Sequence, residues 1–299
     1  MNRNKILVML IGGIIVVAAG YYWMTGGYPQ NEQIQQKGSD TLLVLAQNWA
    51  EAYINIHENV EIVVSAGGSG TGISALINKQ IDIADASRQI KQKELEKASE
   101  AGVEPVEWKV ALDGISIIVN KENPLDELSY DHLRRIYNGS LVNWSEVGGN
   151  EDVIIAYGRQ STSGTYVYFN EEVLNEDDYR VDKQQLAGNA EIVEAVIRDP
   201  NGIGYVGVAY AEARKNELKM VNVKKADTDR AYQPTKDDIA SGKYPISRYL
   251  YVYTDGIPKG AVAEYLKFIL SGDGQEIVND VGYIALPQQI LIEQSSELS

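Results

Sequence analysis

The chain contains no cysteine and only two histidines among its 299 residues. The absence of cysteine excludes disulfide bonds, thiolate catalysis, cysteine-ligated zinc and a lipobox cysteine. His57 and His132 have no second histidine or carboxylate at ligand spacing, so we expect both at the surface rather than in a metal or catalytic site. The sequence therefore predicts no metal and no cofactor.

Positive charge is also scarce. Lysine and arginine number 27 against 42 acidic residues, which gives a net charge of -15. Nucleic-acid binding depends on clustered Lys and Arg, so this balance argues against a nucleic-acid partner. Any anion that the protein binds must be held in a local site, not by the overall field. Hydrophobic residues make up 44% of the chain, which is typical of a folded protein of two domains or one large one.

One long apolar run lies near the N-terminus, at residues 6–23, after two basic residues. Its length falls between a signal-peptide core and a membrane-spanning helix. Ala18-Ala19-Gly20 is a possible cleavage site, whereas Tyr21-Tyr22-Trp23 resembles an interfacial anchor. A buried core helix is the third alternative. Both main interpretations make residues 1–29 a signal peptide or membrane anchor with linker, and place the rest outside the cytoplasm, tethered or secreted.

Beyond residue 30, β-type runs alternate with amphipathic stretches, which predicts parallel sheets with helices on both faces. The expected helices cover residues 42–55, 73–78, 91–101, 130–137, 166–174, 189–198 and 262–270, and the expected strands cover residues 60–64, 81–86, 106–112, 115–119, 153–157 and 249–253. Residues 111–119 continue without a turn and predict a strand that crosses between two lobes.

Three turns rich in Gly, Ser and Thr each follow a β-type run and precede a helix. They are Gly38-Ser39-Asp40-Thr41, Gly67-Gly68-Ser69-Gly70-Thr71-Gly72 and Arg159-Gln160-Ser161-Thr162-Ser163-Gly164-Thr165. Unpaired N–H groups and the helix dipole make each helix N-terminus favourable for an anion. Three such turns in one chain predict a tetrahedral oxyanion held where they meet.

The second turn differs from the better-known glycine loops. It lacks the lysine of a P-loop, its glycines do not fit G-x-G-x-x-G, and Thr71 stands where a nucleophile elbow around Ser69 would need glycine. A backbone nest with Ser69 and Thr71 as hydroxyl donors fits the pattern. A plain structural turn is the alternative.

Arg159 is the strongest candidate for the cation of the site. Its fork of five donors suits a tetrahedral oxyanion and stays charged when dehydrated. Ser163 and Thr165 add hydroxyls, and Gly164 lets backbone N–H groups approach closely. A solvated surface charge is the alternative for Arg159. Arg88 is interpreted equally well as a second cation or as a latch between lobes.

Asp40 and Asp113 lie beside predicted anion-binding turns. A carboxylate there accepts a hydrogen bond only from a protonated oxyanion and repels a fully ionised one. This arrangement favours hydrogen phosphate over sulfate. The structural alternatives are a helix N-cap for Asp40, and a turn or a salt bridge with Arg88 for Asp113.

These motifs together resemble the phosphate-binding receptors of high-affinity phosphate ABC transporters, which belong to the type II periplasmic-binding-protein class. The resemblance covers nearly all of residues 37–290 and rests on the three turns and on Ala86-Ser87-Arg88, Ala111-Leu112-Asp113-Gly114-Ile115, Asn143-Trp144 and Gly202-Ile203-Gly204-Tyr205. It implies an α/β fold of two discontinuous lobes joined by two crossing strands. The expected division is residues 30–114 and 247–299 in lobe I and residues 115–246 in lobe II.

The resemblance also implies which residues hold the anion: those of the first turn, the serine of the second, and the arginine and Ser-Gly-Thr of the third. Together with the neighbouring serines, the candidate site comprises Ser39, Asp40, Thr41, Ser69, Ser87, Arg88, Asp113, Arg159, Ser163, Gly164 and Thr165. Some relatives carry, after the Ala-Ser pair, an aspartate that accepts the phosphate proton. Arg88 occupies that position here, so we expect Asp113 to be the acceptor, with Asp40 as second choice.

The expected function is extracytoplasmic binding of inorganic phosphate by a monomer, which passes the ion to the membrane subunits of an ABC permease without chemical change. A receptor or sensor for another oxyanion, such as sulfate or molybdate, is an alternative. A phosphate-ester hydrolase would need a nucleophile with a base, or two metals. Ser69 has no base evident in the sequence.

Overall fold

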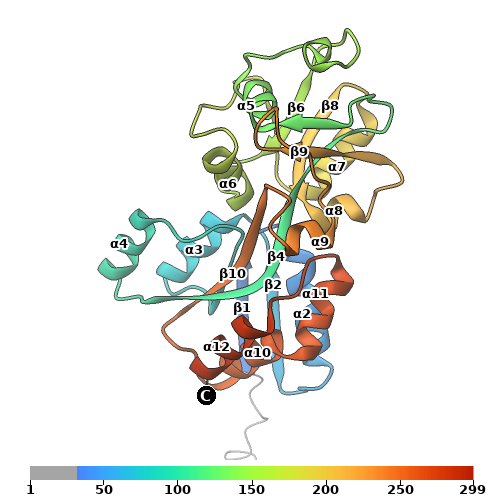
Figure 1. Cartoon of the computed structure of the whole chain (residues 1–299). Coiled ribbons are helices and arrows are strands. Elements are labelled where there is room, and N and C mark those ends of the chain that lie inside the picture. Colours follow the sequence, from blue (N-terminus) through green and yellow to red (C-terminus); the bar gives the residue numbers. More distant parts are fainter. Residues whose placement is uncertain (1–31, 299) are drawn as a thin grey trace, which may run out of the picture.

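The computed structural model describes residues 32–298, which form two lobes connected by a long strand (Figure 1). The signal peptide or membrane anchor that the sequence predicts in residues 1–29 lies outside the described residues. Across residues 32–298, no helix combines the length and the apolar character that crossing a bilayer requires.

The lobe that contains the start of the described chain is built on a sheet in the order β2-β1-β3-β10-β4. Its strands are β1 (Glu32–Gly38), β2 (Val60–Ser65), β3 (Ile83–Ala86), β10 (Ser247–Asp255) and the first part of β4 (Pro105–Asn120). Its helices are α2 (Leu43–Ile54), α3 (Ser69–Ile77), α4 (Gln92–Glu100), α10 (Gly260–Leu270), α11 (Gly272–Val281) and α12 (Gln288–Glu297).

The other lobe continues from the second part of β4. Its remaining strands are β5 (Glu127–Ser129), β6 (Ile155–Arg159), β7 (Gln184–Leu186), β8 (Gly202–Gly207) and β9 (Leu218–Lys224). Its helical segments are α5 (Tyr130–Asn138), the 3-10 turn η1 (Trp144–Val147), α6 (Gly164–Glu172), α7 (Asn189–Arg198), α8 (Val208–Glu212) and α9 (Lys236–Ala240).

Strand β4 passes from one lobe to the other near Gly114. It pairs with β10 from Pro105 to Gly114, and from Ile115 onward with β8 and β9. Each antiparallel strand pair among residues 32–298 involves β4 or β10, and the other pairs are parallel. The predicted two-lobe α/β architecture, with a strand that crosses between the lobes, is confirmed.

Aromatic side chains anchor the core of each lobe. Trp49 and Trp108 are fully buried beside the first sheet, and each indole N–H has a hydrogen-bond acceptor. In the other lobe the rings of Phe169 and Tyr205 stack with centroids 4.2 Å apart, and Tyr137 meets both edge-on. Burial of one such side chain contributes roughly 1.5–3 kcal/mol, so these aromatic residues help to stabilise the core of each lobe.

Some elements begin earlier than the sequence predicts. Helix α3 starts at Ser69 rather than at residue 73, and α6 starts at Gly164 rather than at residue 166. Glycine has a low helix propensity, so sequence reasoning places the start of a helix after its glycine-rich first turn. The Gly70 N–H donates to the Thr162 carbonyl at 3.0 Å, and such contacts hold the turn helical. Strand β9 was not predicted from the sequence.

Candidate functional site

The three Gly-Ser-Thr turns meet between the lobes, as predicted. Gly68 donates its N–H to the Gly38 carbonyl at 2.8 Å, which joins the first turn to the second. A Cβ on Gly164 would overlap Ser69 Oγ and lie 2.6 Å from Ser87 Oγ, so the N-terminus of α6 packs directly on the opposite lobe. The N-termini of α3 and α6, together with the turn before α2, therefore face one small volume.

Hydroxyl groups line this volume from both lobes. Thr41 Oγ1 and Thr165 Oγ1 are 3.0 Å apart, and Ser69 Oγ accepts the backbone N–H of Ser87 at 3.0 Å. Ser163 Oγ is used locally, because it caps α6 by accepting the N–H groups of Thr165 and Tyr166. Ser39 Oγ is buried with no hydrogen-bond partner within residues 32–298. The surroundings are rich in donors, and one hydroxyl is left free for a ligand.

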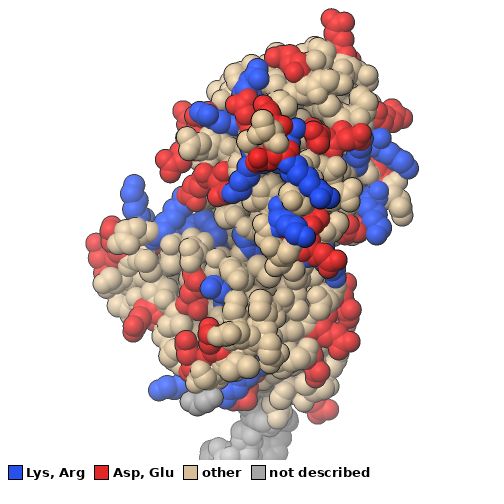
Figure 2. Space-filling view, viewed as in Figure 1, with Lys and Arg blue, Asp and Glu red and all other residues tan. Residues whose placement is uncertain are grey.

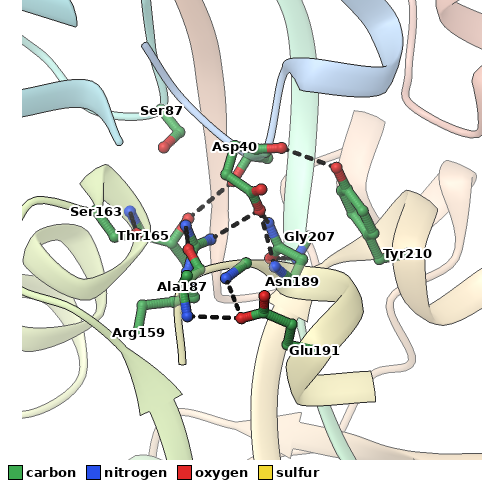
Figure 3. A network of polar contacts seen from close by, with 12 residues as sticks. Asp40, Ser87, Arg159, Ser163, Thr165, Ala187, Asn189, Glu191, Gly207 and Tyr210 are labelled. Atoms are coloured by element: carbon green, nitrogen blue, oxygen red, sulfur yellow. Dashed lines mark hydrogen bonds and ion pairs between the residues drawn. The ribbon is translucent and has the colours of Figure 1, made fainter. Parts of the chain in front are cut away.

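Arg159 ends strand β6 and points into the same volume (Figure 3). Only 2% of the residue is exposed. Its Nη2 donates to the Ala187 carbonyl at 2.8 Å, whereas Nε and Nη1 are buried without a hydrogen-bond partner in the described part of the chain. Burial lowers the pKa of Arg159, and the nearby Asp40 opposes that shift. Buried donors of this kind are costly unless a ligand satisfies them.

Asp40 joins the two lobes through one carboxylate oxygen. Its Oδ2 accepts the backbone N–H of Asn189 at 2.8 Å and the Asn189 Nδ2 at 2.6 Å, and lies 3.2 Å from Nη1 of Arg159. Oδ1 has no hydrogen-bond partner among the described residues. Asp40 does not cap its own helix: the N-cap of α2 is Leu42, without a side-chain bond. It instead accepts from the first turn of α7 in the other lobe (Figure 3).

Asp113 is fully buried and forms an ion pair with Arg248 instead of Arg88. Arg248 donates to its Oδ2 from Nε at 3.0 Å and from Nη2 at 2.8 Å, while the Val208 N–H donates to Oδ1 at 3.2 Å. Arg248 also donates to Thr165 Oγ1 at 2.9 Å and to the Ser87 carbonyl at 2.7 Å. Both oxygens of Asp113 thus accept from protein donors, and Asp113 is linked to the hydroxyl groups of the site through Arg248.

Arg88 turns its guanidinium toward its own lobe. Nη1 and Nη2 donate to the two carboxylate oxygens of Glu94 at 2.8 and 2.7 Å, and Nη1 also donates to the Gln89 carbonyl. Hydrogen bonds to Arg88 and the Lys91 N–H lower the pKa of Glu94, against the effect of burial. The structure therefore places Ser87 at the site and holds the charge of Arg88 in a pair with α4.

Sequence reasoning missed three residues that contact the site: Asn189, Tyr210 and Arg248. Tyr210 donates its hydroxyl to the Asp40 carbonyl at 2.8 Å. Each lies more than 80 residues from the group it contacts, and none belongs to a Gly-Ser-Thr turn. The only signal was composition, because Arg248 is a charged residue at the start of β10, a strand whose centre is apolar and aromatic.

The assembled site offers anion chemistry and little else. It combines helix N-termini, hydroxyl groups and one incompletely satisfied guanidinium. Ser69 Oγ contacts Ser87, and no histidine, lysine or carboxylate bonds to it within the described residues. Residues 32–298 contain no group of three or more metal-ligating side chains placed to hold an ion.

Comparison with family models matches residues 25–273 to the model described as "PBP superfamily domain". The chain is 35% identical over 275 residues to the phosphate-binding protein PstS of Staphylococcus saprophyticus, a match covering 89% of this chain and 84% of the relative. It is 34% identical over 278 residues to PstS of Pseudomonas aeruginosa, covering 87% and 85% respectively.

Solved structures give a consistent result. A protein from Clostridium perfringens, assigned as a phosphate ABC transporter substrate-binding protein and solved with bound phosphate, superposes with a TM-score of 0.76 at 28% identity, covering 86% of this chain and all of that one. An ABC-type phosphate transport receptor from Vibrio cholerae superposes with a TM-score of 0.69 at 26% identity, covering 85% of this chain and all of the other.

Proposed function

The chain belongs to the PBP superfamily and, within it, to the PstS family of phosphate-binding proteins, and on this basis we propose that it binds one inorganic phosphate ion between its lobes and delivers it to an ABC-type permease. The receptor works outside the cytoplasm as a monomer, and residues 1–29 tether it to the membrane or direct its export.

The proposal rests mainly on one observation, the incompletely hydrogen-bonded guanidinium of Arg159. This guanidinium is buried, Nε and Nη1 have no hydrogen-bond partner within residues 32–298, and the Asp40 carboxylate lies 3.2 Å from Nη1. Charge-assisted hydrogen bonds to a dehydrated oxyanion are short and strong, and a guanidinium matches the spacing of two phosphate oxygens. Phosphate would satisfy Nε and Nη1 of Arg159 together with the free hydroxyl of Ser39.

Closure of the two lobes supports capture. Residues 32–114 and 247–298 act as one lobe and residues 115–246 as the other, with β4 as one of the connections. Gly70 meets Thr162 across the opening, and Lys91 Nζ lies 3.2 Å from a carboxylate oxygen of Glu171. Closure around the ion removes water, which strengthens each electrostatic contact inside.

The protein binds phosphate without converting it. Hydrolysis of a phosphate ester would need an activated nucleophile or metal ions. Ser69 and Ser87 bond to each other, both oxygens of Asp113 accept from protein donors, and within residues 32–298 neither Asp40 nor Asp113 bonds to a serine hydroxyl that it could activate. The polar groups of the site thus serve binding and orientation.

Calorimetric titration of the full-length protein in detergent tests the proposal. We expect one phosphate per chain, and much weaker binding of sulfate and molybdate. R159A should weaken phosphate binding by roughly 2–5 kcal/mol, because it removes the charge partner of a buried anion. R159K should recover only part of this loss, since an ammonium lacks the fork geometry.

R198A is the matched control. Arg198 lies in the same lobe as Arg159, and 79% of its side chain is exposed. Its replacement by alanine should therefore leave the phosphate affinity unchanged. Wild-type affinity in R159A would disprove the site assignment. If sulfate or molybdate bound more tightly than phosphate, the ligand assignment would be wrong, whereas the assignment of an oxyanion site would stand.

A further inference from the structure

Lys183 is a buried lysine directly behind Arg159. Only 5% of the residue is exposed. Its Nζ donates to the Arg159 carbonyl at 3.1 Å and lies 5.1 Å from the ring centroid of Tyr166 and 4.9 Å from that of Tyr179. The two rings are themselves stacked, with centroids 4.3 Å apart. The ammonium group is therefore held by one carbonyl oxygen and two aromatic faces.

No carboxylate neutralises this ammonium within residues 32–298. The acidic residue nearest in the sequence, Asp182, is engaged by Arg180 at 2.6 and 2.7 Å. Burial and the nearby charge of Asp178 raise the pKa of Tyr166, and no ion pair joins Asp178 to Lys183 within residues 32–298. Strand β6 contributes the Arg159 carbonyl, which accepts from Nζ of Lys183. Burial lowers the pKa of Lys183 to about 8, with no opposing ion pair.

Tyr179 and Tyr166 also belong to a chain of hydrogen bonds that begins at the backbone N–H of Arg159. The Arg159 N–H donates to the Tyr205 hydroxyl at 3.3 Å, Tyr205 donates to the Tyr179 hydroxyl, and Tyr179 donates to the Tyr166 carbonyl at 2.9 Å. Tyr166 lies in the first turn of α6, next to Thr165. Lys183 is thus packed into a network that includes both the arginine and the helix terminus of the anion site.

Gly158 makes this arrangement possible. A Cβ at that position would lie 2.9 Å from Cδ of Lys183 and 3.1 Å from the Tyr205 hydroxyl. The lysine stem therefore occupies space that any other residue at position 158 would fill. A buried cation without a counter-ion is costly, and the cost is reduced when an anion is bound nearby.

We propose that Lys183 is a second cation of the anion site, a positioning residue that fixes the Arg159 carbonyl and whose buried positive charge strengthens phosphate binding. This inference rests on the proposed function. In this proposal Arg159 contacts the ion through its guanidinium, whereas Lys183 bonds to the Arg159 carbonyl and acts on the ion through its charge.

Phosphate affinities of the wild type, K183Q and K183R, measured by calorimetry between pH 6.5 and 9.5, test the proposal. At pH 7 we expect K183Q to bind roughly tenfold more weakly, because one unit charge near the anion is lost. K183R should retain most of the affinity. K225Q is the matched control, because Lys225 lies in the same lobe with 62% of its side chain exposed.

The pH profile separates charge from packing. Lys183 is protonated below its pKa of about 8 and loses its charge above it, so the wild type should lose its advantage over K183Q as the pH rises through this value. Arginine stays charged, so K183R should keep its advantage. The titration of phosphate itself cancels when affinities are compared at one pH.

Three results would overturn the inference: wild-type affinity in K183Q, a wild-type to K183Q ratio that is constant with pH, or a loss in K183R as large as in K183Q. K183M, which keeps the apolar stem, replaces K183Q if the latter fails to fold. Absence of phosphate binding by the wild type would instead disprove the proposed function.

Discussion

Two carboxylates lie beside the anion site, and their hydrogen bonds assign them different roles. Both oxygens of Asp113 accept from Arg248 and Val208, whereas Oδ1 of Asp40 has no partner in the described part of the chain. An ion that carries a proton needs an acceptor with a free lone pair. We therefore propose Asp40, the second choice from the sequence, as the acceptor for the phosphate proton.

D40N should narrow the preference for phosphate over sulfate by at least roughly tenfold, or about 1.4 kcal/mol. The asparagine amide can donate to an unprotonated sulfate oxygen, whereas the carboxylate repels it. Competition calorimetry at pH 7 with both anions gives the ratio directly. The ratio matters here, rather than the affinity, because D40N also removes the ion pair with Arg159.

N189A and D113N serve as comparisons. Asn189 donates to the other oxygen of Asp40, so N189A should lower the affinity for both anions and keep their ratio. D113N leaves Arg248 buried without its counter-ion, which should reduce the free energy of unfolding by about 3–5 kcal/mol without changing the ratio. A ratio that changes in D113N but not in D40N would return the role to Asp113.

Among the elements, we expect helix α6 to limit how closely the lobes approach. Its N-terminal Gly164 packs against Ser69 and Ser87 of the opposite lobe, where a Cβ does not fit. The same helix brings Thr165 to Thr41 at 3.0 Å. A helix terminus binds an anion well only when its N–H groups reach the ion, so close approach of α6 is needed for both packing and binding.

G164A should hold the lobes apart and weaken phosphate binding by about a hundredfold, whereas the thermal stability of the ligand-free protein should change little. The atoms nearest to the added methyl group belong to Ser69 and Ser87 of the opposite lobe, so opening of the lobes relieves the overlap. Calorimetry gives the affinity, and small-angle scattering with and without phosphate gives the closure.

G272A provides the control, because a Cβ on Gly272 in α11 meets no atom within 4 Å. It should bind and close as the wild type does. If G164A closed normally on adding phosphate, α6 would not be the element that limits lobe approach.

At the scale of the whole molecule, the protein binds an anion although its net charge is -15. Figure 2 shows acidic side chains over both lobes, interspersed with basic ones. A negative field slows the approach of an anion, and salt screens it within about 10 Å. The buried donors of the site must therefore supply the binding energy.

Deletion of residues 1–29 should yield a chain that no longer sediments with membranes and that binds phosphate as tightly as the full-length protein. Every residue of the proposed site, from Ser39 to Arg248, lies outside the deleted segment, and β1 begins its pairing at Glu32. Fractionation of the native host and calorimetry measure the two effects.

A deletion of residues 1–5, which removes Arg3 and Lys5 but keeps the apolar run, is the comparison for localisation. Loss of phosphate affinity in the longer deletion would mean that the N-terminal segment contributes to the folded lobes. Membrane association that persists without it would place the attachment elsewhere in the chain.

The sequence alone determined the local features of this protein. Strand and helix periods, and the glycines and hydroxyl residues of the three turns, act over a few residues, so the alternating α/β pattern and the presence of a helix after each turn were predicted correctly, although α3 and α6 begin earlier than predicted. The uninterrupted apolar run after Asp113 likewise predicted the crossing strand, because nothing in it ends a strand. Arg159 could be selected for its position between a strand and such a turn.

Only the tertiary structure decided which charges meet. Asp113 and Arg248 are 135 residues apart, and Asp40 and Asn189 are 149 apart, so no local spacing could pair them. Lys183 carries no sequence motif, and its burial depends on two tyrosines and on the missing side chain of Gly158. The state of a charged group depends on burial and on partners brought by the fold, because desolvation and ion pairing are properties of the packed interior and not of the chain.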